Sequence, residues 1–205
     1  MYQDGVCRVT GSYYTKMVEF YDINYELLDT PGQAEILQEY SGLLNYFEPG
    51  VKFQLFLFNR KVDRETLVSR IDIPLQVDGF NSIRGEFSQM LKEQMARGSN
   101  GVIKSKYMLF GIDAGSYREA KQRLSVIETG VIKNFHIIGA PAKTMDGKDR
   151  LCLLHEYFNQ YSMEPFHFSY KDMALAGLGV KDYVAPPGFD FRKACSFKSG
   201  EMYGS

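Results

Sequence analysis

The chain contains a partial match to a nucleotide-binding motif. Residues 135–144 read Phe-His-Ile-Ile-Gly-Ala-Pro-Ala-Lys-Thr, which looks like a strand feeding a phosphate-binding loop. Such a loop needs Gly-x-x-x-x-Gly-Lys-Ser/Thr, because consecutive backbone N–H groups wrap the phosphates. Ile137 and Ala142 occupy the two glycine positions, and Pro141 removes one N–H group. The sequence therefore predicts no nucleotide site in this segment.

The histidines do not complete a metal or catalytic motif. His155-Glu156 begins like the zinc-binding helix of metalloproteases, but Asn159 stands where the second histidine is needed. Two histidines one turn apart are what allow a helix to hold zinc on one face. His136 and His167 have no ligand-type neighbours in sequence. We interpret all three as ordinary surface or core-edge histidines and predict no catalytic, metal or cofactor residues.

Residues 111–115, Gly-Ile-Asp-Ala-Gly, leave two interpretations open. They could seat an anion at the start of a helix near Ser116. The favoured interpretation is a strand-to-helix turn, with Asp113 or Ser116 as the helix cap. A small enzyme could also use dispersed groups that share no spacing, and its candidate residues would be Asp113, His136, His155 and Glu156.

Composition favours a globular protein in a reducing compartment. Hydrophobic residues make up 44% of the 205 and charged residues 24%, with a formal net charge of −1. That balance argues against nucleic-acid binding by bulk electrostatics, and Lys104 and Lys106 are the only local basic pair on one strand face. Three cysteines, Cys7, Cys152 and Cys195, are too few and too separated for a disulfide framework or a zinc site.

No apolar run approaches the roughly 18 residues of a membrane-spanning helix. Residues 1–5 lack the basic region and apolar stretch of a signal peptide. We therefore expect any link to a membrane to be peripheral or to go through a partner.

Hydrophobic periodicity predicts an α+β fold with helices layered against one sheet. The N-terminal hairpin, turning at Thr10-Gly-Ser12, makes part of the sheet antiparallel, and a partly ferredoxin-like arrangement fits the order. Thr30 is expected to cap the first helix, with Gln33 completing a capping box. The predicted strands are 5–10, 13–25, 51–58, 103–112 and 135–138. The predicted helices are 30–47, 63–70, 82–97, 116–133 and one that follows Asp146-Gly147.

The composition of two segments predicts how they pack. Val51 to Phe58 is so strongly apolar that it predicts a central strand, buried on both faces. Residues 161–205 read as an extended tail, broken by turn clusters and rich in phenylalanine and tyrosine. Because disordered tails lack aromatic residues, this tail is expected to pack against something. We therefore divide the chain into an α+β domain, 1–160, and a linker, 161–205, leading to a further domain.

An ordered set of short segments carries a family resemblance. The segments are Tyr2–Val9, Tyr14–Tyr25, Leu44–Phe47, Phe80–Arg84, Gly98–Gly101, Lys106-Tyr107, Phe110–Ile112, Ala120–Leu124, Arg150–His155, Pro165-Phe166, Gly177-Leu178, Lys181–Pro186 and Phe189–Phe191. None of them is a catalytic signature, but together they span essentially the whole chain in order. The set resembles the N-terminal domain of the motor ATPases of type IV secretion systems in Gram-positive integrative and conjugative elements.

The resemblance implies a non-catalytic docking and assembly domain at the cytoplasmic face of the cell membrane. In that family a RecA-like motor domain follows, which binds ATP and magnesium and typically forms hexamers. No ATP-binding residue of the family has a counterpart in this sequence, so we expect no enzymatic activity and no cofactor here. The implied partners are inner-membrane components of the secretion complex and other copies of the ATPase. Two alternatives stay open: a nucleic-acid-handling domain of the same machine, and the dispersed-site enzyme.

Overall fold

The computed structural model describes all of residues 1–205 except 62–75, 78, 99–101, 160–165, 186–187, 194–195, 200–201 and 205. For residues 60–61, 94–98, 189, 191–193, 196–199 and 202–204 it describes only the backbone. The chain forms two units, residues 1–57 with 106–205 and residues 58–105.

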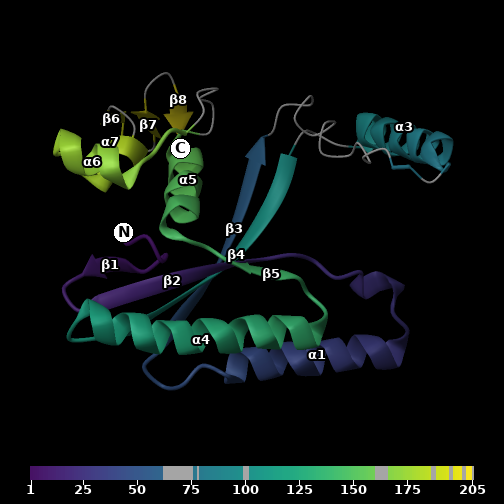
Figure 1. Cartoon of the computed structure of the whole chain (residues 1–205), viewed down its shortest axis with the longest axis horizontal. Coiled ribbons are helices and arrows are strands. Elements are labelled where there is room, and N and C mark those ends of the chain that lie inside the picture. Colours follow the sequence, from purple (N-terminus) through teal and green to yellow (C-terminus); the bar gives the residue numbers. More distant parts are fainter. Residues whose placement is uncertain are drawn as a thin grey trace. The chain divides into compact units, whose positions relative to one another are not determined.

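The fold is α+β, as the periodicity predicts (Figure 1). The described helices are α1 (Thr30–Asn45), α3 (Asn81–Gly98), α4 (Tyr117–Ile138), α5 (Gly147–Phe158), α6 (Tyr170–Ala176) and α7 (Val180–Val184), with a 3₁₀ turn at Tyr25–Leu27. The strands are β1 (Cys7–Thr10), β2 (Tyr13–Phe20), β3 (Lys52–Lys61), β4 (Val102–Asp113), β5 (Ala142–Thr144), β6 (Phe189–Lys193), β7 (Ser196–Ser199) and β8 (Met202–Gly204).

The main sheet is antiparallel and has five strands. Its order is β1-β2-β4-β3, and β5 also pairs with β2. Tyr13 to Phe20 pair in register with Asp113 back to Lys106, so β2 and β4 form its centre. A separate antiparallel sheet has the order β6-β7-β8.

Successive residues of β2 point to opposite faces, because side chains alternate along a strand. Lys16 contacts Glu128 of α4 on one face. Thr15 contacts Arg150 of α5 on the other face. The central strand therefore has a helix packed against each side.

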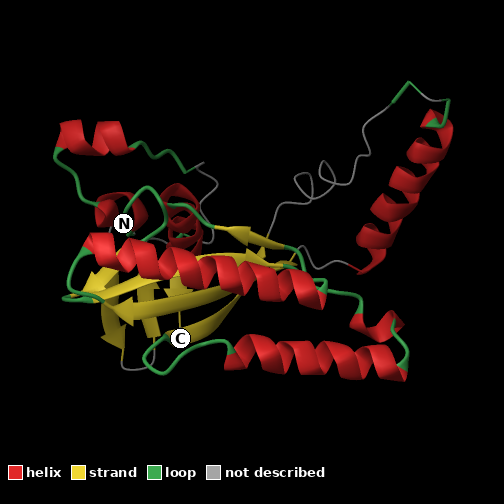
Figure 2. Cartoon of the chain, turned by 60° about the horizontal axis from the view of Figure 1, so that its bottom comes forward, coloured by secondary structure: helices red, strands yellow, loops and turns green. Residues whose placement is uncertain are grey.

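The core lies on the α4 side of the sheet. Helices α1 and α4 run beside one another there (Figure 2). The apolar stripe of α4 is fully buried at Leu124, Val131 and Phe135, and Phe135 stacks on Phe20 of β2 at 4.7 Å between ring centroids. Burial of side chains of this size contributes about 1.5–3 kcal/mol each.

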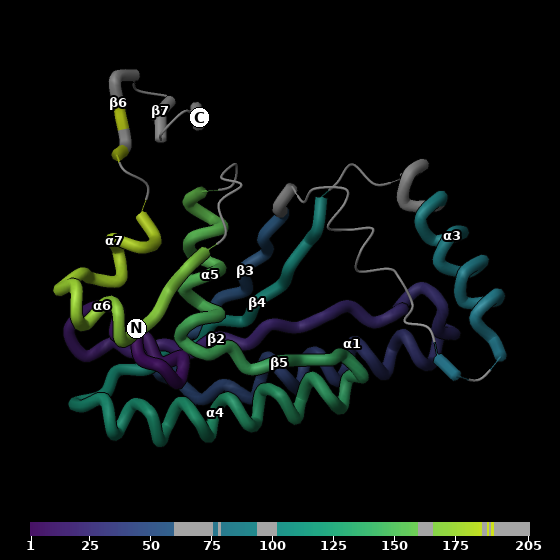
Figure 3. The backbone as a smooth tube through the Cα atoms, turned by 45° about the horizontal axis from the view of Figure 1, so that its top comes forward, coloured from purple at the N-terminus to yellow at the C-terminus, as the bar shows by residue number. Residues whose placement is uncertain are grey.

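Helices α6 and α7 follow α5 along the chain (Figure 3), and the three share a smaller apolar cluster. Leu151, Phe168 and Val184 form its buried centre. Phe168 makes edge contacts with Tyr170 and Tyr183, at 4.8 and 5.1 Å between ring centroids. These tail aromatics pack back onto the preceding helix.

The second unit contains α3 and the adjoining ends of β3 and β4. Asn81 precedes the body of α3 and exchanges two hydrogen bonds with the backbone of Gln76, at 3.0 and 2.9 Å. Three large apolar side chains of this helix, Ile83, Phe87 and Met90, are exposed. The predicted helix 63–70 lies outside the described residues.

Four sequence-based assignments need correction, and the first is the strand predicted at 135–138. These residues are instead the last turn of α4. The apolar stripe of the helix continues with its helical period through Phe135 and Ile138, both buried, before Gly139 ends the helix at φ 81°. The nearby strand is β5, which starts only at Ala142.

The N-cap of α1 lies one residue earlier than predicted. Asp29, not Thr30, is the N-cap, and its carboxylate accepts the N–H of Gly32 at 3.1 Å. The Gln33 side chain donates to the carbonyl oxygens of Tyr25 and Leu28, so it does not form the expected capping box.

β3 is an edge strand, not a central one. A continuous apolar run predicts burial on both faces, but Phe53, Leu55 and Leu57 are 41%, 51% and 61% exposed.

In the tail, residues 170–176 and 180–184 are helical rather than extended. Ser169 caps the first of these helices through the N–H of Asp172, and Gly177 ends it with φ 65°.

Candidate functional site

The groups of the hypothetical dispersed enzyme site lie on separate parts of the fold. Asp113 precedes α4 and His136 is in its last turn, so about 30 Å of helix separates them at 1.5 Å per residue. His155 and Glu156 belong to α5, which packs through Arg150 on the opposite face of the sheet. The structure does not bring these four groups together.

The histidines have structural surroundings. His155 packs against the Phe166 ring, at 4.9 Å between centroids, and its carbonyl oxygen accepts the Asn159 side-chain amide at 3.0 Å. Asn159 therefore helps to close the end of α5 rather than standing in for a metal ligand. His136 and His167 are exposed. Among the described residues, no group of three or more His, Cys, Asp or Glu side chains could hold a metal ion.

Side chains of Ser116 and Glu119 accept hydrogen bonds from backbone N–H groups at the start of α4. The Ser116 hydroxyl accepts the N–H of Glu119 at 3.3 Å, which makes Ser116 the cap. The Glu119 carboxylate accepts the N–H of Gly115 at 2.9 Å and pairs with Arg123 at 3.5 Å. A carboxylate already occupies the place where an external anion would bind, so the turn-and-cap interpretation describes residues 111–116.

The segment that resembles a phosphate loop has a different geometry. Its first four residues are helical, Gly139 makes a left-handed turn, and residues 142–144 pair with β2 as β5. Lys143 forms an ion pair with Asp149 at 3.5 Å. The backbone of residues 142–144 therefore pairs within a sheet rather than wrapping around a ligand.

The basic pair on β4, Lys104 and Lys106, is partly neutralised, because Lys106 forms an ion pair with Asp22.

Among the described helices, none combines the length and apolar character that crossing a bilayer requires.

Two interactions hold β2 between its flanking helices. Arg150 donates to the carbonyl oxygens of Gly5 at 2.6 Å and Thr15 at 2.9 Å, and to the Thr15 hydroxyl at 3.1 Å. Burial lowers the pKa of the guanidinium, but these three acceptors solvate it. On the other face, Lys16 forms a buried ion pair with Glu128, whose Oε1 atom has no hydrogen-bond partner among the described residues.

A polar cluster fastens the N-terminal segment to α4. The Asp4 carboxylate accepts the Tyr117 hydroxyl at 2.8 Å and pairs with Lys121 at 3.1 Å, while the Tyr2 ring stacks on Tyr117 at 3.9 Å between centroids. Partial burial alone would raise the pKa of Asp4, but the hydrogen bonds from Tyr117 and Lys121 outweigh it and lower that pKa. Burial, followed by the bond to Asp4, raises the pKa of Tyr117.

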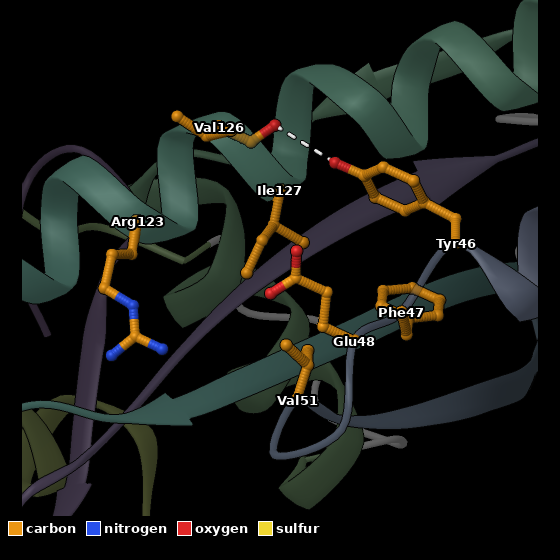
Figure 4. Close-up of a pocket in the computed structure, with 7 residues that line it drawn as sticks. All are labelled: Tyr46, Phe47, Glu48, Val51, Arg123, Val126 and Ile127. Atoms are coloured by element: carbon orange, nitrogen blue, oxygen red, sulfur yellow. Dashed lines mark hydrogen bonds between the residues drawn. The ribbon is translucent and has the colours of Figure 1, made fainter.

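A pocket of about 240 Å³ opens between α4 and the loop that joins α1 to β3. Figure 4 shows its lining: Tyr46, Phe47, Glu48 and Val51 from the loop, and Arg123, Val126 and Ile127 from α4. The pocket exists because α1 ends at Asn45 while α4 continues alongside.

The pocket combines an apolar lining with one charge of each sign. Val51, Ile127 and Phe47 supply apolar surface, while Glu48 and Arg123 are exposed (Figure 4). The Tyr46 hydroxyl donates to the Val126 carbonyl oxygen at 3.5 Å, which ties the loop to the helix. Such a site suits an apolar side chain flanked by charged neighbours.

Gly130 of α4 allows the Tyr46 ring to approach the helix. A Cβ atom at this position would collide with the Tyr46 hydroxyl and ring. None of the sequence motifs pointed to this loop. A Tyr-Phe pair one residue before the Pro49-Gly50 turn was the available signal, since aromatic residues beside a turn need a surface to pack on.

The pocket adjoins the exposed apolar side of β3. Phe47 stacks on Phe53 at 4.6 Å between ring centroids, and Leu55 and Leu57 follow on the same strand face. Pocket and strand together form the candidate interaction surface of the first unit.

We compared the chain with models of known protein families and with curated protein sequences, and neither comparison found a match.

Proposed function

We propose that the chain is a non-catalytic docking and assembly domain of a conjugative-transfer ATPase, placed at the cytoplasmic face of the membrane. The observation that carries the proposal is the pocket between α4 and residues 46–51. It offers an apolar lining with Glu48 and Arg123 beside it, the composition of a site for a partner's apolar anchor. The ordered resemblance to the transfer ATPases supplies the biological context.

The charges of the pocket favour a protein partner over a nucleotide. Arg123 is the one basic residue among the seven lining residues, and it already pairs with Glu119 and donates to the Asp113 carbonyl oxygen at 3.1 Å. Glu48 would repel phosphate groups brought into the pocket. The expected occupant is a segment of an inner-membrane component of the secretion complex, with one apolar residue between charged ones.

A binding experiment with matched charge variants tests this proposal. Immobilised chain is exposed to detergent-solubilised membranes from cells that carry the conjugative element, and from the same cells without it. Glu48→Lys should lower capture of the element's membrane protein by about 10-fold, or 1.4 kcal/mol. Glu35→Lys makes the same charge change on exposed α1 surface away from the pocket and should leave capture unchanged.

The competing functions predict other results. Nucleotide binding in the micromolar range, or clear ATP turnover by the purified chain, would contradict a non-catalytic domain. Tight single-stranded DNA binding in a low-salt gel shift would support the nucleic-acid alternative instead, because phosphate contacts are strongest at low salt. Equal capture by both charge variants would remove the pocket from the docking site.

A further inference from the structure

The outer edge of β3 is long, apolar and unpaired among the described strands. β3 ends the order β1-β2-β4-β3 and runs for ten residues. Its first six residues are Lys-Phe-Gln-Leu-Phe-Leu, with no proline, no glycine and no charge after Lys52. Proteins usually protect such edges with charges, proline or bulges, because a free row of N–H and C=O groups can pair with another strand.

The side chains of this edge are exposed in an alternating row. Phe53, Leu55 and Leu57 are 41%, 51% and 61% exposed and share one face. On the other face, Phe56 contacts Tyr107 and Tyr157, at 6.0 and 5.8 Å between ring centroids. The contacts of Phe56 thus hold one face of the strand in place. On the other face, the row of Phe53, Leu55 and Leu57 keeps exposed apolar surface.

We infer that β3 pairs antiparallel with β3 of a second copy of this chain, about a two-fold axis at Leu55. In this register Phe53 of each copy lies opposite Leu57 of the other, and the two Leu55 residues face one another. All three positions of the row then meet an apolar partner. Aromatic and aliphatic cross-strand pairs of this kind contribute about 0.2–1 kcal/mol each.

The charge of the strand selects this orientation. In the antiparallel register the two Lys52 residues lie six positions apart, about 20 Å at 3.4 Å per residue. A parallel pair would place the two lysines side by side, where like charges repel. The cation of Lys52 is also engaged within its own chain, 5.2 Å from the centre of the Tyr13 ring. Because every position of the exposed row meets an apolar residue of the same row in this register, a second copy is the complementary occupant, and this inference does not depend on the proposed function.

Sedimentation equilibrium of the whole chain tests the inference. One strand edge with three side chains is a small interface, so we expect a weak dimer with a Kd of about 10–100 µM. Leu55→Lys and Leu57→Lys should each raise the Kd at least about 10-fold. Leu37→Lys is the matched control, because Leu37 is 58% exposed on α1 and should leave the Kd unchanged. Circular dichroism of each variant verifies folding.

Crosslinking tests the register. Leu55→Cys should form a disulfide-linked dimer on mild oxidation, since directly opposed Cβ atoms lie about 4.5–5.5 Å apart. Leu37→Cys should not, and both variants retain the native cysteines as a common background. A monomer throughout the concentration range would overturn the inference. So would a dimer that survives both β3 lysine variants, because another surface would then hold it.

Discussion

Arg150 of α5 donates hydrogen bonds to both oxygen acceptors of Thr15, the carbonyl at 2.9 Å and the hydroxyl at 3.1 Å. The same guanidinium reaches the Gly5 carbonyl oxygen. One buried side chain thus joins α5 to β2 and to the segment before β1.

Replacing Arg150 with methionine should destabilise the protein by about 3 kcal/mol, because hydrogen bonds from charged donors are lost and buried carbonyl groups are left without donors. Urea unfolding followed by circular dichroism measures the change. Arg118→Met, an exposed position on α4, is the control and should change stability by less than about 0.5 kcal/mol. A loss below 1 kcal/mol at Arg150 would show that the contact is not a structural anchor.

The buried pair of Lys16 and Glu128 predicts a non-additive result. Removing one partner leaves a buried charge, so Lys16→Met or Glu128→Met alone should cost about 3–5 kcal/mol. The double variant should recover most of that loss, since two apolar side chains replace two buried charges. A double-mutant cycle from urea unfolding gives the coupling. Additive losses would mean that the two charges do not interact in the folded protein.

Asp4 predicts a pH dependence of stability. Its folded-state pKa is lowered from 3.8, so the unfolded chain binds the proton more readily. The carboxylate therefore contributes stability above about pH 4, and that contribution disappears as the pH falls through the folded-state pKa. Because the group is partly exposed, we expect less than about 1 kcal/mol.

Unfolding measured from pH 7 down to pH 2 checks this expectation. Asp4→Asn should be less stable than the wild type at pH 7 and should lose less stability on acidification. Glu35→Gln, on an exposed α1 residue, should follow the wild-type curve. Parallel curves for Asp4→Asn and the wild type would contradict the assigned role of the cluster.

Gly130→Ala should disturb the pocket without breaking α4. Alanine favours a helix by about 1 kcal/mol over glycine, but the new Cβ would collide with the Tyr46 ring. We expect a net destabilisation of about 1–3 kcal/mol from the displaced ring. In the double variant Gly130→Ala/Tyr46→Leu, the substitution at 130 should become neutral or stabilising. A stabilising effect in the presence of Tyr46 would contradict the close contact.

The sequence predicted the elements whose periodicity is long and regular. The stripe of α4 and the alternation of β2 both gave correct element types, because each pattern repeats with one period over the length of its element. The edge position of β3 was missed, since its apolar run resembles that of a strand buried on both faces. The end of α4 was missed for a local reason, because Phe135–Ile138 fits either a short strand or a last helical turn.

The candidate site was less predictable than the fold. Its pocket is lined by residues of 46–51 and of 123–127, and no local sequence pattern predicts a contact between segments so far apart in the chain. Arg150 likewise gave no signal, because an arginine near the start of a helix is ordinarily a solvent-exposed residue. Partners from distant parts of the chain, rather than residue type alone, determine these roles.

A mating assay tests the central claim most directly. In a conjugative element of the kind that the proposal assigns to this chain, the protein is replaced by Glu48→Lys or by Glu35→Lys, and transfer frequency is measured with protein levels matched. We predict that Glu48→Lys lowers transfer by about 10-fold or more, as expected for loss of an interface contact worth 1.4 kcal/mol. Glu35→Lys should transfer at the wild-type frequency. Wild-type transfer with Glu48→Lys and with the rim variant Arg123→Glu would contradict docking through this pocket.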